Sequence, residues 1–261
     1  MKKGMLLSLL SAVCLLASCN GGGDVQAVTQ TGFINVGITM YEPMDYFGDD
    51  GETVIGFDAD LTREFATSLG VTARFVPIAW DSKILELTSK KIDLIWNGMT
   101  ITDELRQSID LSLPYATNYQ CVVAKSSRIS EFVSADSLKS LKVAVEAGSA
   151  GEKAVSDLVK PNAVTSQEAA LLEVKAGTSD CAVVDVTMAN AIVGKGDFTG
   201  LATVASDKIS FEKEDFGVGA RKNSDLTPKL NAFFKDKYTD GTLTKLGEKY
   251  GVAVNDEAFR A

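Results

Sequence analysis

Short apolar runs and helical repeats alternate along the first half of the chain. Three apolar runs predict strands: FINVGI (33–38), TARFVPI (72–78) and IDLIW (92–96). Between them, Leu61, Phe65 and Leu69 recur at helical spacing and predict a helix over 58–69. A second helix is predicted over about 82–90. Strands that alternate with helices predict a parallel sheet with both faces covered.

The same alternation returns in the second half of the chain. LKVAVEAG and DCAVVDV predict strands, QEAALLEVKAG predicts a helix, and another helix is expected from about Gly151. These elements form a second α/β unit over roughly 120–216. FGVGARK predicts a further strand, and helices are expected near 225–238 and 242–250. These last helices need a sheet to pack on, and the simplest place is the first unit.

The predicted fold is therefore an α/β fold of two lobes. Lobe 1 comprises residues 31–118 plus 218–261, and lobe 2 comprises residues 119–217. The segments QCVVA (120–124) and FGVGA (216–220) are expected to cross between the lobes. Two crossing strands predict a hinge rather than a loose linker.

Composition excludes several function classes. Of 261 residues, 45% are hydrophobic, which is enough for a sizeable core. The formal net charge of −9 argues against a nucleic-acid surface, which needs clustered Lys and Arg. The chain has no His, which excludes a His general base, a Ser-His-Asp triad and His metal ligands. We expect no cofactor and no metal.

The N-terminus is typical of an exported protein. Lys2 and Lys3 precede an apolar run too short to span a bilayer, so residues 1–18 are expected to be a signal peptide. LASC, residues 16–19, resembles a bacterial lipobox, which implies cleavage before Cys19 and lipidation of its thiol; the alternative is an ordinary signal peptide. Removal of two Lys makes the mature net charge −9 − 2 = −11. NGGGD favours a flexible tether, assigned to residues 19–30.

Of the four cysteines, Cys14 leaves with the signal peptide and Cys19 is the expected lipid site, so two remain. Cys121 and Cys181 each lie in an apolar run, where isolated Cys residues are usually buried small hydrophobes. A disulfide between them stays open as the alternative, since exported proteins form disulfides.

Candidate ligand-binding residues follow the predicted strands. In open α/β sheets, ligands bind beyond the carboxyl ends of strands. Tyr41, Trp80, the turn NGMT (97–100), the segment AGSAGE (147–152) and Asp185 all occupy such positions. Each has an ordinary structural alternative, as a core aromatic or a helix cap. Their shared position at strand ends favours one common cleft.

Five segments together resemble the polar amino-acid-binding proteins of ABC uptake systems: GFDADL (56–61), IDLIWNGMTITDE (92–104), DLSLPY (110–115), VAVEAGSAGE (143–152) and CAVVDV (181–186). The resemblance covers residues 33–251. It implies the type II periplasmic-binding-protein fold, an amino-acid ligand held between closing lobes, and an ABC permease as partner. It also implies a monomer in the cell envelope, held at a membrane through Cys19.

The resemblance implies a role for each candidate. Asn97, Gly98, Met99 and Thr100 would contact the ligand, and Asp185 would take its ammonium group. The amides of Gly148, Ser149 and Ala150 would hold its carboxylate, because N–H groups at a helix start favour an anion. Tyr41 and Trp80 would flank its side chain.

One position departs from the family pattern. An Arg usually follows the Glu of T-x-E and clamps the ligand carboxylate. Here Leu105 stands at that place and Arg106 comes one residue later. One helical residue is a turn of about 100°. Arg106 serves as the clamp only if this turn is irregular; otherwise it is a solvated surface residue.

Glu146 ends the strand VAVE, where the family places residues near the ligand side chain. A carboxylate beside two aromatics favours a cationic side chain, so we expect a basic ligand such as Lys, Arg or ornithine. Two alternatives remain. One is a dehydratase-like enzyme for cyclic acids with Glu146 as its acid, which would have less use for Asp185. The other is a ligand-sensing subunit that acts through a separate signalling protein.

Overall fold

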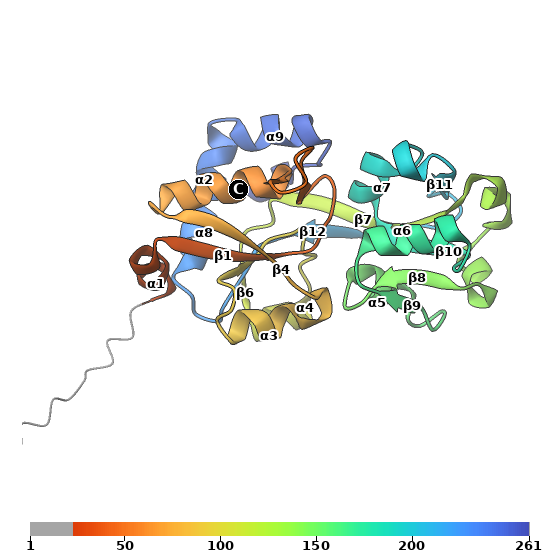
Figure 1. Cartoon of the computed structure of the whole chain (residues 1–261), viewed down its shortest axis with the longest axis horizontal. Helices are drawn as coiled ribbons and strands as arrows, with labels where there is room; N and C mark the ends of the chain where they lie inside the picture. The colour runs from red at the N-terminus through yellow and green to blue at the C-terminus, as the bar shows by residue number, and fades with distance from the viewer. Residues whose placement is uncertain (1–22, 261) are drawn as a thin grey trace, which may run out of the picture.

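The computed structural model describes residues 23–260 as two lobes, each built on its own sheet (Figure 1). The sheet of lobe 1 has the order β4-β1-β5-β13-β6. Its strands are β1 (Phe33–Ile38), β4 (Thr72–Pro77), β5 (Leu94–Ile95), β6 (Asp110–Leu111) and β13 (Gly219–Ala220). β1 is parallel to β4 and β5, as expected, whereas β13 is antiparallel to both β5 and β6.

Helices cover both faces of the lobe 1 sheet (Figure 1). They are α1 (Asp24–Thr31), α2 (Phe57–Ser68), α3 (Lys83–Thr88), α4 (Asp103–Ser108), α8 (Leu226–Thr239) and α9 (Thr242–Tyr250). A small hairpin pairs β2 (Tyr46–Phe47) with β3 (Val54–Ile55), and short 3-10 helices cover Trp80–Ser82 and Asp256–Phe259.

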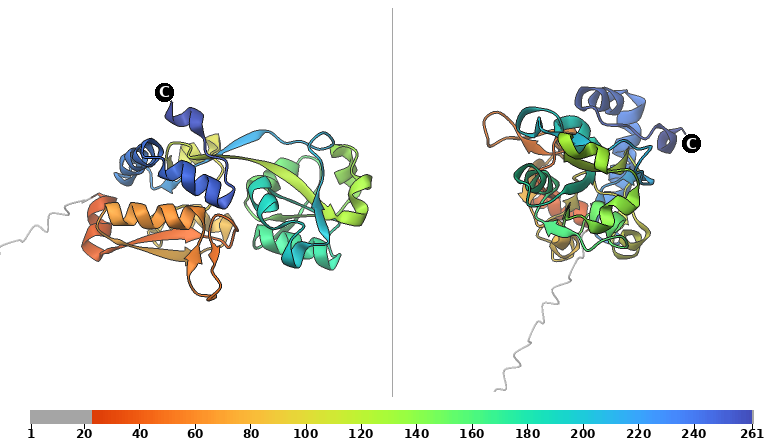
Figure 2. Two further views of the ribbon diagram at one scale, coloured as in Figure 1. Left: turned by 90° about the horizontal axis from the view of Figure 1, so that it is seen from above. Right: turned by 90° about the vertical axis from the view of Figure 1, so that its right-hand side faces the viewer.

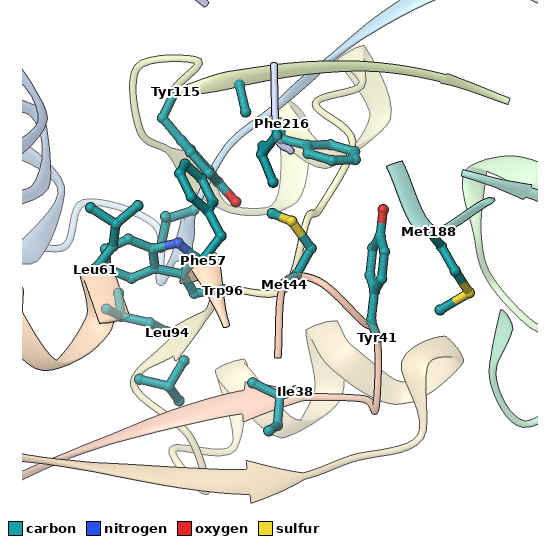
Figure 3. Packing of buried hydrophobic residues seen from close by; sticks show 14 of the residues in the cluster. Ile38, Tyr41, Met44, Phe57, Leu61, Leu94, Trp96, Tyr115, Met188 and Phe216 are labelled. Carbon is teal, nitrogen blue, oxygen red and sulfur yellow. The ribbon is translucent and has the colours of Figure 1, made fainter. Parts of the chain in front are cut away.

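The last helices do pack back on the first unit, as expected. Phe233 and Phe234 of α8 lie against the indole of Trp96, with ring centroids 6.4 and 5.3 Å away. Tyr115 stacks on Phe234 at 5.0 Å. Figure 3 shows Trp96 packed beside Phe57 and Tyr115. Trp96 directly precedes the turn that begins at Asn97, so the C-terminal helices support this wall of the cleft.

The sheet of lobe 2 has the order β11-β7-β10-β8-β9, with β12 paired to β7. Its strands are β7 (Ala116–Lys125), β8 (Val143–Glu146), β9 (Asn162–Val164), β10 (Cys181–Asp185), β11 (Leu201–Thr203) and β12 (Lys213–Phe216). Its helices are α5 (Ala150–Val155), α6 (Gln167–Ala176) and α7 (Val186–Ile192), with 3-10 turns at Ser126–Glu131, Ala135–Ser140 and Gly196–Phe198.

Two strands connect the lobes. β7 and β12 pair antiparallel, with Thr117 opposite Asp215 and Tyr119 opposite Lys213, and both run from one lobe to the other (Figure 2). The predicted second crossing, FGVGA, is only partly right. β12 ends at Phe216 and β13 begins at Gly219, so the expected strand is interrupted at Gly217, which packs against Ile101 with no room for a side chain. The predicted lobe boundaries at 118–119 and 217–218 lie beside this crossing pair.

Two N-terminal predictions have different outcomes. The signal peptide and the lipid site at Cys19 lie outside the described residues. The tether assigned through residue 30 is wrong from Asp24 onward, where α1 begins. Asp24 pairs with the guanidinium of Arg221 at 2.9 Å, and the buried Val28 packs in the lobe 1 core. These contacts attach the segment to the lobe.

Cys121 and Cys181 are both buried and free. They lie on the paired strands β7 and β10, where Cys121 faces Val184 and Cys181 faces Ala124. The cysteines are therefore three register positions apart and belong to separate core clusters on opposite faces of the sheet. That geometry excludes a disulfide between them in this fold.

Candidate functional site

A cavity of about 270 Å³ lies between the lobes. Residues of both lobes line it, at the carboxyl ends of β1, β4 and β5 in lobe 1 and of β8 and β10 in lobe 2. Every predicted ligand-binding residue except Arg106 lines this cavity. The strand-end argument therefore finds the right edge of both sheets.

Arg106 lies outside the cavity, and the clamp prediction is wrong for this structure. Thr102 caps α4 by accepting a hydrogen bond from the Leu105 amide at 3.2 Å, so the turn is a regular helix start. Arg106, one residue after Leu105, therefore points about 100° away from it around the helix. Leu105 is half-buried and lines the cavity, whereas Arg106 is exposed and borders a separate surface hollow beside Glu212.

The polar atoms of the lobe 1 turn are largely used within the protein. Asn97 donates to the Asp45 carboxylate at 2.7 Å and accepts from the Thr39 hydroxyl at 2.9 Å. The Gly98 amide donates to Asp58 at 2.7 Å. Asp58 is the first Asp of GFDADL, so this motif positions the turn. Burial raises the pKa of Asp58 to about 7.

A glycine is also required at position 98, because the backbone conformation and the neighbouring Tyr41 ring leave no room for a side chain. Its φ is +57°, and a side chain there would come within 2.9 Å of the Tyr41 ring. The Thr100 hydroxyl, at the end of the turn, donates its one hydrogen to Glu214 of β12 at 3.0 Å, whereas the Thr100 amide donates to no other described residue. The turn is thus joined to the hinge, because Gly217 N also donates to Met99 O at 2.9 Å.

Aromatic and apolar side chains form the rest of this wall. Tyr41 stands between Met44 of its own lobe and Met188 of lobe 2 (Figure 3). Its buried hydroxyl has no hydrogen-bond partner among residues 23–260, and burial beside Asp185 raises the pKa of Tyr41. Trp80 is buried, and the Met99 side chain packs into the small core around it.

In lobe 2, Asp185 ends β10, lines the cavity and accepts from three side-chain amides. Asn118 and Gln120 donate to one carboxylate oxygen at 2.7 and 2.6 Å, and Gln167 donates to the other at 2.6 Å. Burial raises the pKa of Asp185, and these donors oppose the rise. Gln120 and Gln167 were not predicted as site residues. Only the positions of Gln120 on β7 and of Gln167 at the start of α6 could have indicated them.

Glu146 also has an unsatisfied polar atom in the cavity. Its side chain is 3% exposed, and Oε1 has no hydrogen-bond partner in the described part of the chain. Burial, followed by the nearby charge of Asp185, raises the pKa of Glu146 to about 8. Oε1 therefore stands ready to accept a hydrogen bond from a donor that enters the cavity.

The segment 148–150 differs in detail from the prediction. Gly148 N donates to Glu152 at 2.7 Å, and Ser149 N donates to Glu146 O at 3.2 Å, so both amides are occupied. The amides of Ala150 and Gly151 make no hydrogen bond to other described residues. The free donors at this helix start are thus shifted by one or two residues along the chain.

Lys83 is the main residue that the sequence prediction missed. It is 8% exposed and lines the cavity three residues after Trp80, within the segment AWDSK that follows β4. Its ammonium donates to Trp80 O at 3.1 Å and to Gly148 O at 2.9 Å. The second bond joins lobe 1 to lobe 2.

The lobes are closed around the cavity. A side chain at Gly148 would lie 2.7 Å from the Asp81 Cα, so the lobe surfaces touch there. At the mouth, Lys153 of α5 and Glu104 of α4 approach to 3.7 Å. The lobes therefore enclose a small polar space rather than an open groove.

The family profile of bacterial extracellular solute-binding proteins, family 3, matches residues 34–253. The chain belongs to this family. Among its relatives, the L-cystine-binding protein TcyJ of Escherichia coli is 30% identical over 252 residues, which cover 95% of this chain and 93% of that protein. A mutant of ArgBP from T. maritima is 30% identical with a TM-score of 0.80, covering 87% of this chain and 98% of that one.

A further solved family member is an ABC uptake transporter substrate-binding protein from Streptococcus pneumoniae with bound histidine. It is 29% identical with a TM-score of 0.79, over 88% of this chain and 96% of that one. The two-lobed type II fold is therefore confirmed. Within residues 23–260, no group of His, Cys, Asp and Glu has the geometry of a metal site. No helix in that range is long and apolar enough to cross a membrane.

Proposed function

We propose that this family member captures an amino acid with a second positive group and delivers it to an ABC permease. The observation that carries the proposal is the pair of buried carboxylates, Asp185 and Glu146, on neighbouring parallel strands that face one closed cavity. A buried carboxylate is stable when a cation pairs with it. Asp185 would take the α-ammonium, and Glu146 the second cation.

The ligands of the relatives agree with this chemistry. Arginine and cystine carry a second basic group beyond the α-ammonium, and histidine does so when protonated. The α-carboxylate would meet the backbone amide of Thr100 and the free amides of Ala150 and Gly151 in place of an Arg clamp. Tyr41 and Trp80 would flank the side chain.

Binding between the lobes explains how capture is coupled to closure. Only the closed form brings Asp185 and Glu146 of lobe 2 against Tyr41, Trp80 and Lys83 of lobe 1. A ligand that contacts both walls stabilises the closed form by its differential affinity. The permease would then receive the closed, monomeric protein.

A calorimetric screen over the common amino acids tests this function. Arginine, ornithine, lysine and cystine should bind more tightly than glutamine or alanine, and they should raise the thermal unfolding midpoint in proportion to affinity. Glutamine that binds more tightly than all dibasic ligands would contradict the second cation. Absence of binding by any amino acid would contradict capture itself.

We infer from the N-terminal sequence that Cys19 carries the lipid that holds the protein at a membrane. A Cys19→Ser variant should move from the membrane fraction to the soluble fraction and lose incorporation of a fatty-acid label. A Cys14→Ser variant is the matched control, because Cys14 leaves with the signal peptide. Equal membrane retention of the two variants would contradict lipid anchoring.

One observation favours a second candidate function. A buried carboxylic acid whose pKa is about 8 is protonated at neutral pH, and a general acid needs that property. A dehydratase for cyclic acids would use Glu146 in this way. Mass spectrometry of ligands after prolonged incubation separates the functions, because a binding protein returns every ligand unchanged.

A further inference from the structure

Lys83 gives the cavity a buried cation in addition to its carboxylates. Two of its three N–H bonds go to Trp80 O and Gly148 O, and the ammonium lies 4.8 Å from the centre of the Trp80 ring. A lysine ammonium has three donors, so one remains for a group in the cavity. Burial lowers the pKa of Lys83, and the charge of Glu146 opposes that change.

Lys83 and Glu146 belong to the same end of the cavity. The lysine bonds to Gly148, two residues after Glu146, and each of the two charges shifts the pKa of the other. Asp185 has a separate set of partners, the amides of Asn118, Gln120 and Gln167. The charge of Asp185 also raises the pKa of Glu146, so the cavity holds two neighbouring carboxylates, with the ammonium of Lys83 on the Glu146 side, its second end.

Simple amino acids leave this second end unsatisfied. The cationic side chain of lysine or arginine meets Glu146 but also lies beside Lys83, which repels it. An acidic side chain meets Lys83 but lies beside Glu146. A neutral side chain leaves the Oε1 atom of Glu146 without a donor, although it is buried. Each of these ligands therefore meets an unfavourable charge or an unpaired polar atom.

We propose that the preferred ligand is a diamino dicarboxylic acid, with an ammonium and a carboxylate at both ends of a linear chain. Asp185 and the free amides of the turn after β8 take the first end. Glu146 accepts from the second ammonium, and Lys83 donates its remaining N–H to the second carboxylate. Lys83 is then the residue that separates such ligands from ordinary basic amino acids. This inference rests on the proposed amino-acid capture.

Three ligands test the inference by removing one charge at a time. LL-2,6-diaminopimelate has both ends complete, L-lysine lacks its second carboxylate, and L-2-aminopimelate lacks its second ammonium. By calorimetry, diaminopimelate should bind roughly 10- to 100-fold more tightly than either, the factor for a charge-assisted hydrogen bond. Lysine that binds as tightly as diaminopimelate would overturn the inference.

Substitution of Lys83 assigns the preference to its ammonium. In Lys83→Met, the ratio of the diaminopimelate and lysine affinities should fall toward one, even if loss of the Gly148 bond weakens both ligands. Lys83→Gln is the second variant, for the case in which Lys83→Met does not fold. Lys91→Met is the matched control, since Lys91 is exposed and pairs only with Glu86. It should keep the wild-type ratio.

An unchanged ratio in the Lys83 variants would overturn the inference while leaving amino-acid capture intact. Lys83 would then bind the carboxylate shared by both ligands or only join the lobes. In Glu146→Gln, the preference for diaminopimelate over aminopimelate should fall in the same way. If no amino acid binds the wild-type protein, the proposed function and this inference both fail, which is a different result.

Discussion

The two walls of the cavity use their polar groups in opposite ways. In lobe 1, Asn97 and the Gly98 amide are bound to Asp45 and Asp58 behind the wall. In lobe 2, Glu146 keeps an unpaired oxygen toward the cavity. Lobe 1 therefore offers aromatic surfaces and one buried ammonium, whereas lobe 2 offers the two buried carboxylates.

This difference shows why burial of a polar residue beside a ligand site does not assign its role. Asp58 and Asp185 are both fully buried acids at the edge of the cleft. Asp58 accepts from the protein's own Gly98 and Tyr115 and shapes the turn. Asp185 lines the cavity itself. The contrast predicts that one acid controls stability and the other controls binding.

Asp185→Asn should cause the largest effect on binding. Loss of the carboxylate leaves the buried ligand ammonium unpaired at a cost of about 3–5 kcal/mol, so affinity should fall by at least about 100-fold. Calorimetry measures the affinity. Asp197→Asn, an exposed acid of the same lobe, is the control and should bind normally. An affinity of Asp185→Asn within threefold of wild type would show that Asp185 does not bind the ligand ammonium.

Asp58→Ala should lower the free energy of unfolding by about 2–4 kcal/mol. Gly98 N and the Tyr115 hydroxyl lose their acceptor, and each buried unpaired donor costs about 1–3 kcal/mol. Urea denaturation measures the change. Glu64→Ala on the same helix removes a partly exposed ion pair with Lys237 and should cost less than about 1 kcal/mol. Similar losses of unfolding free energy in both variants would contradict the structural role assigned to Asp58.

Binding of a dibasic ligand should strengthen as pH rises toward about 8. Burial raises the pKa of Glu146 to about 8, so below that pH the carboxyl must lose a proton before it can accept from a cation. Affinity should rise by up to about tenfold per pH unit below the pKa and level off above it. Glu146→Gln should flatten the curve. Because Asp58 also titrates near 7, the difference between wild type and this variant is the relevant measurement.

The same pKa shift predicts how the stability of the unliganded protein changes with pH. The pKa of Glu146 is higher in the folded protein than its ordinary value of 4.5, so folding favours the protonated acid. Stability should therefore be lost as pH rises from about 4.5 to about 8. Glu146→Gln should lose less stability over this range in denaturation experiments. A larger loss in the variant would contradict the assigned burial.

Arg106→Ala should have the smallest effect, with affinity changed by less than about twofold. The side chain is exposed and lies outside the cavity, where charge interactions are weak. Calorimetry with arginine and lysine checks this. A tenfold loss would mean that Arg106 reaches the ligand in a conformation other than this one.

Periodicity predicted most of the elements, because burial of one face of a helix or strand leaves a repeat in the sequence. The strands 33–38 and 181–185 and the helices over 226–239 and 242–250 are close to their predicted ranges. Each of the two wrong predictions has an identifiable cause. Gly217 divides the expected strand into β12 and β13, and α1 is held by an ion pair with Arg221, about two hundred residues away in sequence.

The position of Arg106 marks what a sequence comparison leaves undecided. The shift from Leu105 by one residue was visible, but its consequence depended on whether the turn was a regular helix. The Thr102 cap makes it regular and directs Arg106 away from the cavity. Lys83 was invisible for the complementary reason: a lysine on a short helix is normally solvated, and only the approach of Gly148 from lobe 2 buries it.

The two-lobed α/β organisation and the family could be predicted without a structure, since both depend on local periodicity and on contiguous motifs. The strand ends that line the cavity could be predicted in the same way. Which polar groups are free for a ligand could not be predicted. That depends on partners far apart in the chain, such as Asp58 with Gly98 and Lys83 with Gly148, which come together only after folding and closure.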